Sequence, residues 1–168
     1  MAKNKVIDEK NEAYEAFKAA LMDICVDISR NIAKDGEGAS KLLTCIVQQA
    51  PDITCAKKVA KSVITSSLFK AAMFGKDANW GRILCAIGYT DAIFDVDKID
   101  VTLSSEAGEL PVCVNGSGCG FDEDHAANVL EEDEIDILID MHQGEGYATA
   151  WGCDLTSDYV KINGDYRT

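Results

Sequence analysis

Basic residues are scarce in this chain of 168 residues. It carries 16 Lys and Arg against 29 Asp and Glu, so its formal net charge at pH 7 is −13. Such an acidic surface repels phosphate groups, which argues against nucleic acid or an anionic membrane as a partner. No apolar run approaches the roughly 20 residues of a membrane-spanning helix. Because the start also shows no signal-peptide pattern, we expect a cytoplasmic protein.

Histidine is rarer still, and the cysteines form no metal-binding pattern. His125 and His142 stand alone in their segments, and the seven cysteines include no Cys-x-x-Cys pair. We interpret the cysteines as buried thiols in a reducing compartment, with a metal site or a disulfide framework as the less favoured alternative. The acidic clusters 122–124 and 131–134 are interpreted as solvated helix ends and turns in preference to cation sites.

Apolar periodicity predicts several helices. After Asn11, a plausible N-cap, apolar residues recur every three or four positions, which predicts a long amphipathic helix that stops at Gly36. Its apolar face comprises Tyr14, Phe17, Leu21, Ile24, Ile28 and Ile32. Further helices are expected after Pro51-Asp52, over residues 79–87, and from Asp122 to Leu130.

Other segments have the composition of strands. Residues 42–47 form a short apolar run typical of a buried strand, and residues 68–74 are read as a second one, with a helix as the alternative. Residues 99–103 and 134–140 alternate apolar and polar positions, and 112–114 is the expected hairpin partner of the former. We therefore expect one domain, residues 1–168, with an α/β (α+β) layered sandwich and a mixed sheet.

Three segments resemble, in the same order, segments of one known family. Residues 33–41 read Ala-Lys-Asp-Gly-Glu-Gly-Ala-Ser-Lys, and residues 74–89 contain Phe-Gly-Lys-Asp-Ala-Asn-Trp-Gly-Arg. Together with the aromatic-rich end, residues 144–168, they resemble the ornithine acetyltransferases, or glutamate N-acetyltransferases, of arginine biosynthesis. The resemblance implies the sandwich shared with the self-cleaving aminopeptidases. It also implies transfer of an acetyl group from N-acetylornithine to glutamate.

The family's reactive threonine has no counterpart in this sequence. In that family a precursor cuts itself between an Ala and a Thr, and the freed Thr heads the second (beta) chain as nucleophile. Met1 falls at an internal position of that chain, and the first threonine here is Thr44, inside a predicted strand. We therefore expect the C-terminal part of a beta chain, inactive without the alpha chain and the missing upstream segment.

Two other functions stay open at the level of the sequence. The chain is alternatively an inactive fragment or remnant that acts only as a folded binding or oligomerising module. A hydrolase akin to the related aminopeptidases is a weaker alternative, since it needs the same missing nucleophile. The resemblance further implies a heterotetrameric assembly, and no metal or organic cofactor, with acetyl-CoA as an alternative acetyl donor.

Glu37, Asn163 and Thr168 match the substrate-binding residues of the family. From the residues alone, Glu37 between Gly36 and Gly38 is best interpreted as an exposed turn after a helix. The resemblance changes this interpretation to substrate binding, with the Glu37 carboxylate facing an ammonium group. An Asn amide both donates and accepts hydrogen bonds, and Asn163-Gly164 also favours a tight turn.

Other segments of chemical interest are expected to be structural. Arg82, in Asn79-Trp80-Gly81-Arg82, could bind a carboxylate, but we favour an architectural role for this segment. The glycine-rich residues 116–120 lack the Lys-Ser/Thr of a phosphate-binding loop and are interpreted as a turn. A catalytic trio of Cys153, His142 and Asp154 is conceivable but not favoured. The apolar residues near the C-terminus, Trp151, Tyr159, Ile162 and Tyr166, are expected to dock into the fold.

Overall fold

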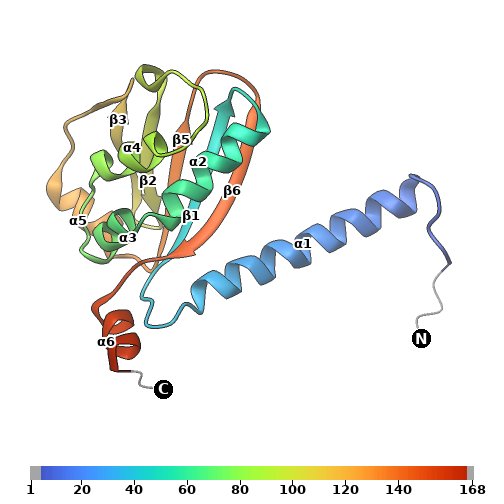
Figure 1. Ribbon diagram of the computed structural model, residues 1–168, viewed down its shortest axis with the longest axis horizontal. Coiled ribbons are helices and arrows are strands. Elements are labelled where there is room, and N and C mark those ends of the chain that lie inside the picture. The colour runs from blue at the N-terminus through green and yellow to red at the C-terminus, as the bar shows by residue number, and fades with distance from the viewer. Residues whose placement is uncertain (1–4, 166–168) are drawn as a thin grey trace.

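A six-stranded mixed sheet forms the centre of the protein, for which a computed structural model describes residues 5–165. Its strands are β1 (Leu42–Ala50), β2 (Asp100–Ser105), β3 (Gly108–Val114), β4 (Ser117–Gly118), β5 (Glu134–Asp140) and β6 (Gly146–Cys153). They lie in the order β4-β3-β2-β5-β1-β6 (Figure 1). β1 and β5 run parallel, and the other neighbouring pairs are antiparallel.

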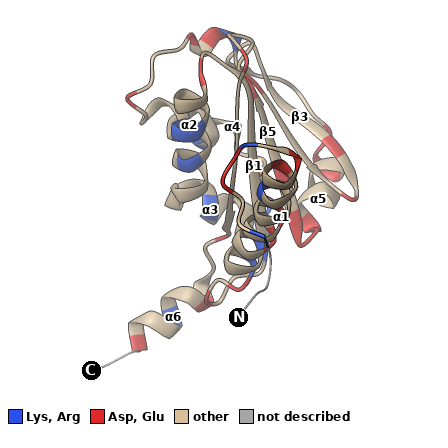
Figure 2. Cartoon of the chain, turned by 90° about the vertical axis from the view of Figure 1, so that its right-hand side faces the viewer, with Lys and Arg blue, Asp and Glu red and all other residues tan. Residues whose placement is uncertain are grey.

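Three helices cover one side of this sheet (Figure 2). They are α2 (Ile53–Thr65), α3 (Ser67–Phe74) and α4 (Trp80–Gly88). α2 packs on β1 and β6, and both α3 and α4 pack on α2, whereas α5 (Glu123–Glu131) packs against β2 and β3. A 3-10 turn, η1 (Val96–Lys98), leads into β2. The layered arrangement of helices and mixed sheet is the one that the sequence predicts.

The core is built from alternate residues of the central strands. Six side chains of β1 and β5 have no exposed surface: Leu43, Cys45, Val47, Ile135, Ile137 and Ile139. Burying each aliphatic side chain of this kind contributes about 1.5–3 kcal/mol to folding. Burial also raises the pKa of the Cys45 thiol. The expectation that the cysteines are buried holds for Cys45, Cys55 and Cys113 but is wrong for Cys25 and Cys85, which are exposed.

Short polar side chains begin most of the helices. Asn11, Asp52, Ser66, Asn79 and Asp122 each accept a hydrogen bond from the backbone N–H three residues further on. Such N-caps satisfy donors that have no partner within the helix. The strand expected over residues 68–74 is wrong: with Ser66 as its cap, this segment forms α3. A continuous apolar run buried on several sides does not distinguish a strand from a short helix.

The C-terminal part is only partly docked. β6, which we did not predict, pairs with β1 at the edge of the sheet, so the segment that contains Trp151 belongs to the fold. The following helix α6 (Ser157–Asp165) has no buried residue. The tight turn expected at Asn163-Gly164 is wrong, because both residues lie within α6. Two of the residues named above, Tyr166 and Thr168, lie outside the described residues.

Helix α1 (Glu12–Lys34) projects away from the sheet beyond β6 (Figure 1). Its predicted apolar stripe exists, but α1 has no buried residue, and Phe17, Ile24 and Ile28 are each more than half exposed. Its last turns are held to the domain by Arg30 and Lys34, which both pair with Glu134 at 3.0 and 2.7 Å. No helix among residues 5–165 is long and apolar enough to cross a membrane.

The turn between α1 and β1 is tightly enclosed. Gly38 has φ +66, a left-handed conformation that glycine adopts readily, and a Cβ there would lie 2.8 Å from the backbone N of Tyr159 in α6. A Cβ on Gly36 would lie 2.6 Å from Cys153 Sγ at the end of β6. Thr156 Oγ1 donates to Gly38 O at 2.6 Å and accepts from Tyr159 N–H. A side chain at Gly36 or Gly38 would therefore collide with the end of β6 or with α6, which pack against this turn.

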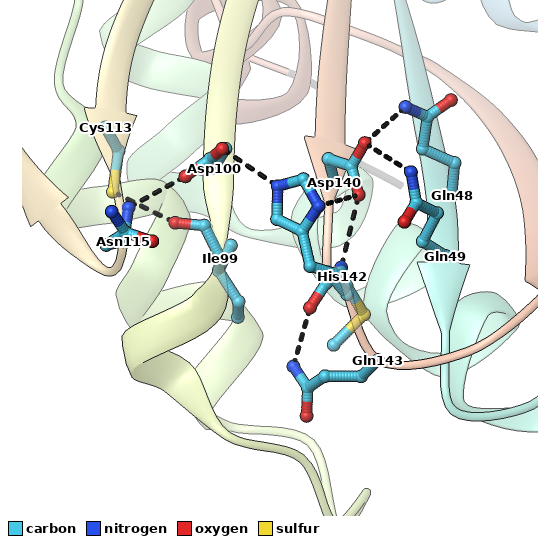
Figure 3. A network of polar contacts seen from close by, with 10 residues as sticks. Gln48, Gln49, Ile99, Asp100, Cys113, Asn115, Asp140, His142 and Gln143 are labelled. Carbon is cyan, nitrogen blue, oxygen red and sulfur yellow. Dashed lines mark hydrogen bonds and ion pairs between the residues drawn. The ribbon is translucent and has the colours of Figure 1, made fainter.

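A polar network ties three strand ends together at the opposite end of the sheet (Figure 3). His142 Nε2 lies 2.9 Å from Asp100 Oδ2, and its Nδ1 lies 3.3 Å from Asp140 Oδ1. Asp140 Oδ2 also accepts from the side-chain amides of Gln48 and Gln49. Only a protonated imidazole donates from both nitrogens. The hydrogen bond to Asp100 therefore raises the pKa of His142, and the nearby Asp140 raises it further.

We predict that stability depends on pH through His142. Because its pKa is raised in the folded state, its contribution is complete below the ordinary histidine pKa and is lost as the pH rises through the folded value. Chemical unfolding of wild type and His142→Gln should therefore differ most near pH 5.5 and least near pH 8.5. His125→Gln is the control, because His125 bonds a backbone carbonyl, Glu109 O. Equal pH profiles for wild type and H142Q would contradict the prediction.

A second prediction concerns the enclosed turn. Gly38→Ala should destabilise the protein by about 1–2 kcal/mol, because a left-handed alanine is strained and its methyl group meets Tyr159. Amides of α6 should exchange with deuterium faster as the helix is displaced. Gly120→Ala is the control, since a Cβ there has nothing within 4 Å and the residue lies outside α6. Unchanged exchange in α6 of G38A would show that Gly38 does not hold this helix.

Candidate functional site

The structure brings together two of the three predicted site residues. Asn163 Nδ2 donates to Glu37 Oε2 at 2.7 Å, although the two residues are 126 positions apart. The same amide nitrogen also donates to Tyr159 O at 3.0 Å, one turn back in α6. This leaves Glu37 Oε1 and Asn163 Oδ1 as acceptors. Two oxygens of this kind, one of them charged, suit an ammonium group or an amide N–H.

Buried Asp154 anchors both sides of this site. Its side chain accepts hydrogen bonds from Ser40 N at 2.8 Å, Ser40 Oγ at 2.5 Å and Lys41 N at 3.1 Å. Asp154 is only 3% exposed, and these donors compensate the cost of burying its charge. Since Asp154 directly follows β6 and Ser40 directly precedes the β1 region, the contact fixes the Glu37 turn against the end of β6.

Two adjoining cavities lie beside Glu37. The first, about 270 Å³, is lined by Glu37, Thr65, Ser67, Lys70, Cys153, Asp154, Leu155 and Tyr159. The second, about 390 Å³, is lined by Ser29, Ile32, Ala33, Gly36, Ile64, Thr65, Lys70, Trp151, Gly152 and Cys153. Thr65, Lys70 and Cys153 line both. The ends of α1, α2 and β6 and the middle of α3 thus line two neighbouring hollows that share three residues.

The Asn79–Arg82 segment has structural contacts. Asn79 caps α4, and Arg82 Nη1 donates to Leu68 O at 3.0 Å. Trp80 packs against Gly118, where a Cβ would lie 2.4 Å from the indole ring. Neither Trp80 nor Arg82 lines the two cavities beside Glu37. These contacts agree with the architectural role that we favoured. The turn expected over residues 116–120 is only partly confirmed, because Ser117 and Gly118 form strand β4.

Cys153, His142 and Asp154 are not assembled as a catalytic trio. His142 belongs to the polar network at the far end of the sheet, whereas Cys153 and Asp154 lie at the near end. β6 separates them, and a strand of eight residues spans about 25 Å. Asp154 is also occupied by Ser40 and Lys41. Among the described residues, no group of three or more His, Cys, Asp or Glu could hold a metal ion.

Sequence reasoning missed two residues of this site. Asp154 was considered only as part of the trio, and Lys70 was not singled out. Asp154 follows an unpredicted strand, so no pattern indicated its partners Ser40 and Lys41. Lys70 lies in the segment read as a strand, and only its place on α3 directs it to the Glu37 region. A correct helix assignment for residues 67–74 would have been the earliest signal.

The family model described as the ArgJ family matches residues 1–168. The chain is 53% identical over 168 residues to the arginine biosynthesis bifunctional protein ArgJ of Caldanaerobacter subterraneus subsp. tengcongensis, covering 100% of this chain and 42% of that protein. It is 51% identical over 165 residues to ArgJ 1 of Clostridium acetobutylicum, covering 98% of this chain and 40% of that protein.

A solved structure gives the same result for the fold. The crystal structure of the arginine biosynthesis bifunctional protein ArgJ from Bacillus halodurans superposes with a TM-score of 0.89 at 39% identity. The match covers 98% of this chain and 76% of that chain. The layered α/β fold and the resemblance found in the sequence motifs are thereby confirmed. The chain spans 40–42% of the length of these two curated relatives, and it belongs to the ArgJ family.

Proposed function

We propose that this chain is a subunit of a glutamate N-acetyltransferase, or ornithine acetyltransferase, that works in arginine biosynthesis. The observation that carries the proposal is the contact between Glu37 and Asn163, the two described residues that match the family's substrate-binding positions. Thr168 is proposed as the third such residue. The names of the relatives place them in arginine biosynthesis and support this assignment.

The proposed chemistry needs a nucleophile, which we assign to another segment of the enzyme. In the proposed route, a threonine hydroxyl from another segment attacks the acetyl carbonyl of N-acetylornithine. The amide C–N bond breaks, the amine takes up a proton, and ornithine leaves an acetyl ester behind. The amine of glutamate then attacks this ester and releases the hydroxyl. No cofactor takes part in the proposed route, and acetyl-CoA is an alternative acetyl donor.

Glu37 and Asn163 would bind substrate beside this threonine. The Glu37 carboxylate suits the δ-ammonium group of N-acetylornithine, because opposite charges in a partly enclosed cavity attract more strongly than in water. Asn163 holds Glu37 in position through Nδ2 and presents Oδ1 as a second acceptor. The pair would therefore contribute substrate recognition, while the bond-making groups come from outside this chain.

Two surfaces of the chain suggest that another protein segment binds to it, and we propose that this segment is the rest of the same enzyme. One is the exposed apolar stripe of α1. The other is the second face of the sheet, where Thr102, Leu138, Ile46 and Thr149 form a row of cross-strand neighbours that are only half buried. In a layered sandwich both surfaces would be covered. The assembled enzyme is proposed to be an oligomer of the cytoplasm, where its seven free cysteines would stay reduced.

Acetyl transfer tests the proposed function. This chain alone, and this chain mixed with the part of the Caldanaerobacter ArgJ that lies outside the match, are supplied with N-acetylornithine and glutamate while ornithine release is measured. We expect turnover only in the mixture. Glu37→Gln should lower kcat/KM by about tenfold or more, because a charge-assisted contact is lost. Glu145→Gln, at the far end of the sheet, is the control. If the mixture is folded but releases no ornithine, the chain would instead be an inactive binding module.

The partner surface has its own prediction. Ile24→Asp and Ile28→Asp should weaken association with the remaining part of the enzyme, measured by analytical ultracentrifugation, by about tenfold or more, because each introduces a charge into an apolar contact. Ala19→Asp lies about 200° around the helix from Phe17 and serves as the control. Association unaffected by the isoleucine changes would exclude this stripe as the contact.

A further inference from the structure

Lys70 differs from the other cations that are at least half buried among residues 5–165. It is half buried, and among residues 5–165 no acceptor lies within hydrogen-bonding or ion-pair distance of its Nζ. By contrast, Arg30 and Lys34 share Glu134, and Lys41 Nζ donates to Glu131 O and Glu132 O. A lysine whose stem is packed against the protein and whose ammonium group has no partner is available to an anion. The position of Lys70 thus indicates an anion that residues 5–165 do not provide.

The backbone holds Lys70 firmly beside the Glu37 site. It lies in the middle of α3, whose start is fixed by the Ser66 cap. Lys70 O accepts a hydrogen bond from Leu155 N at 3.2 Å, which joins α3 to the segment between β6 and α6. Figure 2 shows basic residues on α2 and α3, on the side of the sheet away from most of the acidic residues around α5.

Lys70 and Glu37 line the same cavity of about 270 Å³ and carry opposite charges. The remaining charged group there, Asp154, is already saturated by Ser40 and Lys41. The cavity therefore offers a ligand the second oxygen of the Glu37 carboxylate and the Lys70 ammonium group, which has no partner among residues 5–165. This arrangement complements a molecule that itself carries both an ammonium and a carboxylate group.

We propose that Lys70 binds the α-carboxylate of the amino-acid substrate, an inference that rests on the proposed function. N-acetylornithine and glutamate differ at the distal end but share the α-carboxylate. A residue that recognises the shared group serves both halves of the reaction, whereas the δ-ammonium group that suits Glu37 is present only in N-acetylornithine. Lys70 is thus a binding residue that determines specificity for α-amino acids over simple amines.

The test compares two ligands and three variants. N-acetylputrescine is N-acetylornithine without its α-carboxylate, and both are titrated into the isotopically labelled chain at millimolar concentrations while NMR spectra are recorded. Wild type should bind N-acetylornithine more tightly. Lys70→Met should lose about tenfold in affinity for N-acetylornithine and nothing for N-acetylputrescine, as expected for a charge-assisted contact. Lys70→Arg should retain most of the preference. Lys57→Met, an exposed lysine on α2, should behave as wild type.

Several results would overturn the proposal. K70M could lose the same affinity for both ligands, which would indicate a structural role, or lose affinity for neither. The wild type could also bind neither ligand, or bind both equally well. The outcome is separable from that of acetyl transfer. Carboxylate-dependent binding through Lys70 without turnover in the assembled mixture would remove the proposed reaction and leave the binding residue in place.

Discussion

The carboxylate of Asp154 is the constraint on which the rest of the site depends. Its hydrogen bonds to Ser40 and Lys41 join the residue after the last strand to the residues before the first. Lys41 extends the connection, because its Nζ donates to the carbonyls at the end of α5. A charge that is 3% exposed would be unfavourable without these donors. With them, three segments distant in sequence meet at one corner of the sheet.

That corner explains how an exposed carboxylate gains a defined position. Glu37 follows a helix that is itself largely free of the domain, so local structure alone would leave the side chain unrestrained. Asn163 restrains it from α6, and the close packing of Gly36 and Gly38 restrains the backbone. Preorganisation of this kind reduces the entropy that is lost when a ligand binds. The far end of the sheet is held separately, by the network around His142.

Local sequence patterns predicted the helices and strands better than they predicted the contacts between these elements. The alternation of Ile135, Ile137 and Ile139 gave the bounds of β5, because strand periodicity shows directly in the sequence. β6 was missed because its Gly, Ala and Thr residues make a weak apolar pattern. The pairing of Glu37 with Asn163 was reached only through family resemblance, since nothing local links residues 126 positions apart. Asp154 and Lys70 depend on such distant contacts as well.

The position of β1 in the sheet has a consequence for the order in which the protein is made. β1 pairs with β5 on one edge and β6 on the other, so both partners lie about 90 to 110 residues later in the chain. At the usual 5–20 residues per second, a ribosome needs roughly 5 to 20 seconds to synthesise them. During that time the most buried strand of the protein has two open edges, and α2, which follows it directly, is the first element able to shield it.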